Sequence, residues 1–143
     1  MRKIAIVYWS GTGNTEKMAQ AILDGAKKGG AEAELFPVAD FGSDKLADYD
    51  AVAFGCPAMG SEELEESEFE PFFASAEAKL KGVPVALFGA YGWGSGDWMR
   101  TWEERTRAAG AKLFDEGKIV QEDSIDDSMG SCTEFGEKFA QFL

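Results

Sequence analysis

Three short runs of apolar residues, separated by segments with helical periodicity, limit the folds open to this chain more than any other feature. The runs are Ile4 to Trp9, Ala51 to Cys56 and Val83 to Gly89. Continuous apolar runs of this length are typical of strands that are covered on both faces, as in parallel sheets with helices on either side. We therefore expect these runs to be inner strands of an α/β protein.

Two further segments have the composition of strands at the edges of a sheet. Glu32 to Val38 alternates charged and apolar residues, and Lys112 to Val120 is interrupted by Asp115-Glu116-Gly117. Five strands alternating with helices predict an open, doubly wound parallel sheet with helices on both faces. The strand order 2-1-3-4-5 puts the three apolar runs inside, and its switch point lies between strands one and three.

Helical segments fall between the strands. Thr15 to Lys28 ends at Gly29-Gly30, which is a typical C-terminal cap. The patterns Ser67-x-x-Glu70 and Ser131-x-x-Glu134 match capping boxes and predict where two more helices begin. Because no linker or repeat divides the chain, we expect residues 1–143 to form a single domain.

Charge and composition exclude several classes of partner. The net charge is −12, which nucleic acid and anionic membranes would repel and which a basic protein would attract. The chain has no histidine and two cysteines, Cys56 and Cys132, so we expect neither a metal site nor a disulfide framework. The first apolar run is too short for a signal peptide or a membrane span. We therefore expect a cytoplasmic protein, and the strong charge favours a monomer.

The segment Ser10-Gly11-Thr12-Gly13-Asn14-Thr15 lies where the first strand should pass into the first helix. Hydroxyl and amide side chains, glycines and a helix N-terminus together are suited to bind an anion. A dinucleotide fingerprint fails because Glu16 stands where its third glycine belongs, and a P-loop fails because Glu16 and Met18 flank Lys17. Two interpretations remain: a site for a mononucleotide phosphate, or a helix N-cap without a ligand. The segment itself contains no Lys or Arg, so a bound phosphate would keep its charge.

The loops after strands three and four should lie at the same edge of the sheet as this segment. The first loop, Gly55 to Glu62, contains Met59, and the second, Gly89 to Trp98, contains Trp93 among glycines. A Met and a Trp on flanking loops are suited to hold a flat aromatic ligand between them.

At this point the chain resembles the flavodoxins, in particular the short-chain flavodoxins of anaerobic bacteria. The matching segments are Tyr8 to Glu16, Ala58 to Glu65, and Ala86 to Gly94, and the resemblance covers essentially the whole chain. It implies the flavodoxin fold, a noncovalent FMN cofactor and low-potential, one-electron transfer between redox partner proteins, mainly between the semiquinone and hydroquinone. It does not imply an enzyme. The alternative is an FMN reductase of the same fold that acts on quinones or nitro compounds.

The resemblance also implies roles for individual residues. Ser10 to Thr15 would bind the FMN phosphate, with Trp9 near the phosphate and ribityl end. Met59 and Trp93 would flank the isoalloxazine ring, and Glu62 would accept a hydrogen bond from the flavin N3–H. Many relatives have a serine at the position of Ala90, which here offers only its backbone. The full implied set is Trp9, Ser10, Gly11, Thr12, Gly13, Asn14, Thr15, Ala58, Met59, Gly60, Ser61, Glu62, Gly89, Ala90, Tyr91, Gly92, Trp93 and Gly94.

Two features of this region are expected to influence the reduction of the flavin. Gly60 occupies the first central position of the turn Met59-Gly60-Ser61-Glu62, where a type II′ turn requires a positive φ. Acidic residues around the same edge should disfavour full reduction and attract basic redox partners. These acidic residues are Glu62, Glu63, Glu65, Glu66, Glu68, Glu70, Glu122, Asp123, Asp126 and Asp127.

Overall fold

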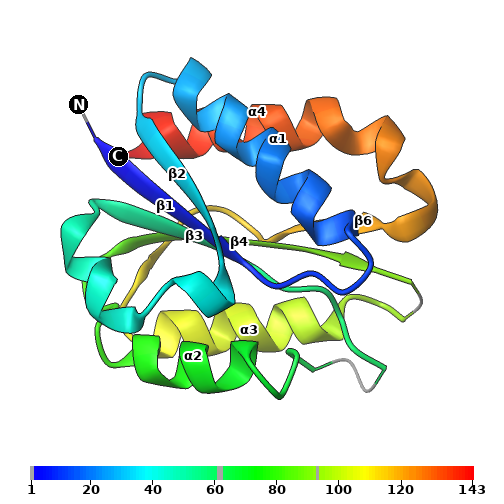
Figure 1. Cartoon of the computed structure of the whole chain (residues 1–143), viewed down its shortest axis with the longest axis horizontal. Coiled ribbons are helices and arrows are strands. Elements are labelled where there is room, and N and C mark those ends of the chain that lie inside the picture. The colour runs from blue at the N-terminus through cyan, green and yellow to red at the C-terminus, as the bar shows by residue number, and fades with distance from the viewer. Residues whose placement is uncertain (1, 61–62, 93) are drawn as a thin grey trace.

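The computed structural model describes residues 2–60, 63–92 and 94–143, and its strands form one parallel sheet (Figure 1). The strand order is β2-β1-β3-β4-β5, with β6 also paired to β4, so the predicted order 2-1-3-4-5 is confirmed. The strands are β1 (Lys3–Tyr8), β2 (Glu32–Pro37), β3 (Ala51–Gly55), β4 (Pro84–Tyr91), β5 (Lys112–Leu113) and β6 (Lys118–Gln121). The helices are α1 (Asn14–Lys28), α2 (Phe69–Glu77), α3 (Asp97–Ala108) and α4 (Met129–Phe142), with short 3₁₀ helices at Val38–Asp40, Ser43–Asp48, Glu122–Ser124 and Asp126–Ser128.

Helices cover both faces of the sheet, α1 and α4 on one side and α2 and α3 on the other (Figure 1). Successive residues of a strand point to opposite faces, so Ile4 and Ile6 of β1 pack under α1 and α4 while Ala5 and Val7 pack toward α2 and α3. A central strand therefore needs apolar side chains at every position, which is the pattern that β1, β3 and β4 show.

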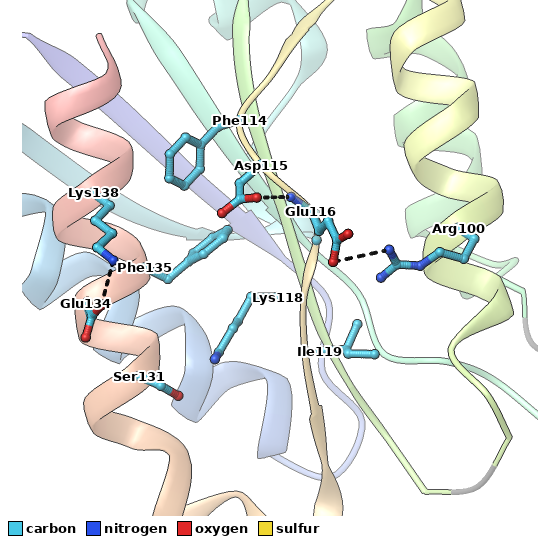
Figure 2. A pocket seen from close by; sticks show the side chains of 11 residues that line it. Arg100, Phe114, Asp115, Glu116, Lys118, Ile119, Ser131, Glu134, Phe135 and Lys138 are labelled. Atoms are coloured by element: carbon cyan, nitrogen blue, oxygen red, sulfur yellow. Dashed lines mark hydrogen bonds and ion pairs between the residues drawn. The ribbon is translucent and has the colours of Figure 1, made fainter.

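The fifth strand is divided in two at the predicted interruption. Both pieces pair with β4, β5 at Pro84–Val85 and β6 at Phe88–Tyr91. Between them Asp115 has a φ of 51°, and a Cβ at Gly117 would overlap the side chain of Met99. Figure 2 shows the hollow of about 420 Å³ beside this break, where Lys138 pairs with Glu134 at 2.7 Å. Among the residues that the structure describes, none of those predicted to form the functional site lines this hollow.

The end of α1 follows the sequence prediction. Gly30 has a φ of 97°, its N–H donates to the carbonyl of Lys27, and the N–H of Ala31 donates to the carbonyl of Ala26 at 3.1 Å. This pair of bonds is a Schellman cap, in which glycine occupies the left-handed position.

Both predicted capping boxes are wrong. Helix α4 begins at Met129, before Ser131, whose hydroxyl donates instead to the carbonyl of Ser128 at 2.8 Å. Helix α2 begins at Phe69, and its first N–H groups bind the carboxylate of Glu65. In both places, contacts beyond the four-residue pattern decide which group satisfies the first turn.

Candidate functional site

The segment between β1 and α1 presents free backbone N–H groups at the N-terminus of a long helix. Gly13 has a φ of 94°, and the Ser10 hydroxyl oxygen accepts hydrogen bonds from the N–H groups of Gly13 at 3.0 Å and Glu16 at 3.4 Å. The N–H groups of the remaining residues have no acceptor within residues 2–60, 63–92 and 94–143; they are Gly11, Thr12, Asn14 and Thr15. Such N–H groups, at the positive end of a helix dipole, form an anion-binding arrangement.

Trp9 and Thr15 lie at the two ends of this segment. The Trp9 ring lies against Gly11, where an added Cβ would be 3.1 Å from the ring, and its indole nitrogen donates to Glu68 at 3.4 Å. Thr15 is buried, and its hydroxyl oxygen accepts the N–H of Ala90 at 3.4 Å. Thr15 therefore joins this segment to the end of β4, a role that its polar side chain alone did not reveal.

Backbone hydrogen bonds continue past the ends of the strands and bring the loops together. The N–H of Trp9 donates to Gly55 at 2.9 Å, and the N–H of Ala58 donates to Ala90 at 3.0 Å. The chain segments after β1, β3 and β4 therefore lie side by side at the carboxyl edge of the sheet. This is the switch point, where ligands bind in open α/β sheets.

A hollow of about 260 Å³ lies between the loops after β3 and β4 and is lined by Ala58, Met59, Gly60, Gly92 and Glu122. Glu122 comes from the segment after β6, as the sequence predicted for the acidic edge. The positions predicted for Ser61, Glu62 and Trp93 lie outside the described residues.

The prediction of a positive φ at Gly60 is wrong in this structure. Its φ lies outside the left-handed region, and an added Cβ would meet nothing within 4 Å. The N–H of Met59 donates to the carbonyl of Glu63 at 3.1 Å.

The described residues of the glycine-rich segment after β4 have different environments. A Cβ at Gly89 would overlap the carbonyl oxygen of Cys56, so strand packing by itself requires a glycine there. Ala90 is buried, and the Tyr91 ring packs against Trp98 at 5.8 Å between centroids, on the α2 and α3 side of the sheet. Gly92 lines the hollow, and Gly94, with a φ of 96°, follows in the same loop.

The site has a negative electrostatic environment. Three hollows lie along this edge: the one between the loops after β3 and β4, a second beside Trp9 and Ser10, and a third lined by Met59, Gly60 and residues 63–67. No lysine or arginine is among the described residues that line them. The nearest cation in sequence, Lys17, pairs with Asp126 at 3.2 Å. Glu63, Glu66 and Glu122 line the hollows.

Two of the glutamates expected at this edge are engaged elsewhere. Glu65 is buried and accepts backbone N–H groups of α2, whereas Glu70 binds the Arg105 guanidinium through both carboxylate oxygens. The sequence does not distinguish Glu65 and Glu70 from the exposed glutamates beside them, because all of these residues lie in one acidic run.

Cys56 and Trp98 are buried next to the site, at the end of β3. Cys56 is fully buried, and burial raises the pKa of its thiol to about 12, so this cysteine is a packing residue. The Trp98 indole donates to the carbonyl of Cys56 at 3.2 Å and so holds the end of β3. The sequence analysis does not predict this contact, because Trp98 and Cys56 are 42 residues apart in the chain.

The donor set and the shape of this edge fit FMN. Free N–H groups at a helix N-terminus suit a phosphate, and the hollow between Met59 and Gly92 is adjacent to strand ends that carry further backbone groups. Fold and site together define a doubly wound α/β protein that binds a mononucleotide at its switch point.

Comparison with known proteins makes this class specific. The sequence profile of the family described as Flavodoxin matches residues 6–135, and the chain belongs to the flavodoxin family. The chain is 49% identical to a flavodoxin of Clostridium beijerinckii over 94% of its own length and 97% of the relative's. It is also 49% identical to a flavodoxin of Megasphaera elsdenii, over 96% and 98% of the two chains.

Solved structures agree with this assignment. The two-electron reduced Megasphaera elsdenii flavodoxin superposes with a TM-score of 0.86 at 47% identity and covers 96% of this chain and 98% of its own. A flavodoxin from the domain Archaea gives a TM-score of 0.88 at 26% identity, over 98% and 97% of the two chains. Flavodoxins bind FMN and carry electrons, so this chain is an FMN-binding electron carrier and not an enzyme. The alternative of an FMN reductase is not favoured.

Proposed function

We propose that this protein transfers single electrons at low potential between basic redox proteins, using noncovalent FMN held at the carboxyl edge of its sheet. The phosphate would bind the free N–H groups of Gly11, Thr12, Asn14 and Thr15, and Met59 would lie against the ring. FMN supplies the redox chemistry, because it accepts and releases electrons one at a time. The roles of Ser61, Glu62 and Trp93 remain predictions from the sequence.

The observation that carries the proposal is an anion site without a cation. The phosphate segment offers N–H groups and hydroxyls, Lys17 is paired with Asp126, and carboxylates line the neighbouring hollows. Additional negative charge on a bound flavin would be repelled by this environment, so the second one-electron reduction becomes less favourable. A low potential for that step is the consequence, and it suits the protein to donate electrons.

A spectroscopic titration tests the cofactor and the reaction. The purified protein, or its apoprotein after addition of FMN, should be yellow and should take up electrons from dithionite in two separate one-electron steps. A protein that binds no added FMN would refute the proposal. Rapid oxidation of NADPH with a quinone would instead support a reductase.

The electrostatic part has its own test, in which Glu122→Gln is compared with Glu32→Gln. Glu122 lines the hollow, whereas Glu32 is the first residue of β2 and lies at the opposite, amino edge of the parallel sheet. We expect only the first substitution to raise the lower midpoint potential. The increase should shrink between about 0.01 M and about 1 M salt, where the screening length falls from about 30 Å to about 3 Å. Equal effects of the two substitutions would contradict a local field.

The same acidic edge supports docking of basic partners to a monomer in the cytoplasm, with residues 1–143 acting as one domain. Within the described residues no helix has both the length and the apolar character needed to cross a membrane. Steered association should slow with increasing ionic strength, and stopped-flow mixing with a basic redox protein measures this. A rate that does not depend on salt would argue against an acidic docking face.

A further inference from the structure

Glu65 is a buried carboxylate in an otherwise exposed acidic run. It is 6% exposed, while Glu63, Glu66 and Glu68 around it are exposed. Its Oε2 accepts the N–H of Ser67 at 2.7 Å. Its Oε1 accepts the N–H groups of Glu68 at 2.7 Å and Phe69 at 2.9 Å. A carboxylate is tolerated in such a place only when donors satisfy it, so these bonds hold the side chain and the first turn of α2 in one arrangement.

The backbone of Glu65 is tied at two further points. Its N–H donates to the Cys56 sulfur at 3.4 Å, and its carbonyl accepts the N–H of Glu70 at 2.8 Å. Cys56 directly follows β3, so Glu65 connects the end of this strand to the start of α2. The two ends of the loop that carries Met59 and Gly60 therefore meet at this residue.

This loop has little packing beneath it. A hollow of about 420 Å³ is lined by Met59, Gly60 and residues 63–67. Within the described part of the loop, a further hydrogen bond joins the N–H of Met59 to the carbonyl of Glu63 at 3.1 Å. These polar anchors, together with the packing of Ala58 and Leu64 against the core, determine where Met59 lies.

We infer that Glu65 is a positioning residue for the flavin: its carboxylate holds the start of α2 and thereby sets the position of the loop that carries Met59 and Gly60. This inference rests on the proposed function, in which that loop contacts the flavin ring. Glu65 acts through the loop and does not itself touch the cofactor. Its contribution is thus separate from that of the exposed glutamates, which act through their charge.

The test compares Glu65→Gln with Glu66→Gln, because both remove one negative charge from adjacent positions. A glutamine offers one acceptor oxygen to three N–H groups and turns a donor toward them, whereas Glu66 is exposed. We expect Glu65→Gln to weaken FMN binding by at least about tenfold. It should also change the separation between the two one-electron midpoint potentials relative to Glu66→Gln.

Two outcomes would overturn the inference. If Glu65→Gln lowers the free energy of unfolding but matches Glu66→Gln in FMN affinity and in both potentials, Glu65 is a helix cap and nothing more. If Glu65→Gln does not fold, Glu65→Asp takes its place, because aspartate keeps the charge but shortens the side chain. Its FMN affinity and both of its potentials are compared with those of Glu66→Asp, and equal values for the two variants again refute positioning. A wild-type protein that binds no FMN would refute the proposed function instead.

Discussion

Replacing Thr15 by valine tests whether one buried hydroxyl joins the phosphate segment to the sheet. Thr15 is 1% exposed, and its Oγ1 accepts the N–H of Ala90 at 3.4 Å. The carbonyl of Ala90 accepts the N–H of Ala58, which lies beyond Gly55, the last residue of β3. β3 therefore does not extend far enough to supply an acceptor for the N–H of Ala90. Valine keeps the branched shape and leaves a buried N–H without an acceptor, which costs about 1–3 kcal/mol. With a urea dependence of about 2 kcal/mol per M, the unfolding midpoint of the apoprotein should fall by about 0.5–1.5 M.

The same substitution should weaken FMN binding, because the hydroxyl proton of Thr15 would also donate to the phosphate. A hydrogen bond to a charged group contributes about 1.5–3 kcal/mol. This corresponds to an increase in the dissociation constant of about 10- to 150-fold. Quenching of FMN fluorescence by the apoprotein measures it, with Thr15→Ser as the control that keeps the hydroxyl. Thr133→Val, in α4, controls for the same exchange in a helix away from the site. Equal affinities of Thr15→Val and Thr15→Ser would refute the reasoning.

Three further predictions concern stability and are measured by urea unfolding. Gly89→Ala should lower the free energy of unfolding by about 1–3 kcal/mol, because its Cβ would overlap a backbone oxygen. Gly60→Ala, with open space around the added Cβ, should change the free energy of unfolding by less than about 0.5 kcal/mol. Arg105→Lys loses the paired bonds to two glutamates of α2 and should cost about 0.5–1 kcal/mol, whereas Arg107→Lys on the same helix should cost nearly nothing; equal losses would contradict the ion-pair geometry. Burial raises the pKa of Glu65, but its backbone hydrogen bonds outweigh this and leave the pKa below its ordinary value of 4.5. Its stabilisation is therefore complete above that pH and is lost as the pH falls through the lower folded value, so acidification should destabilise Glu65→Gln less than the wild type.

Most of the fold was predictable because it depends on patterns between neighbouring residues. The apolar runs of β1, β3 and β4 predicted inner strands, and Asp115-Glu116-Gly117 predicted the break that separates β5 from β6. Strand order followed from which segments require burial on both faces. The start of α1 directly after the glycines and hydroxyls of residues 10–13 was also predictable, since these residues are contiguous.

The acidic run after β3 shows where such reasoning stops. The sequence pattern predicted Ser67 as the cap of α2, whereas in the structure the Glu65 carboxylate accepts the N–H of Phe69, and Phe69 is buried against Phe73 and Trp102.

The sequence by itself therefore determined the strand order and the family, because local periodicity and contiguous motifs carry them. Only the tertiary structure decided which glutamate is buried at α2, which one binds Arg105 and which ones line the hollows at the carboxyl edge of the sheet. Residues of one type in one run have the same local preferences. They differ only in what distant parts of the chain, such as Cys56 and α3, place beside them.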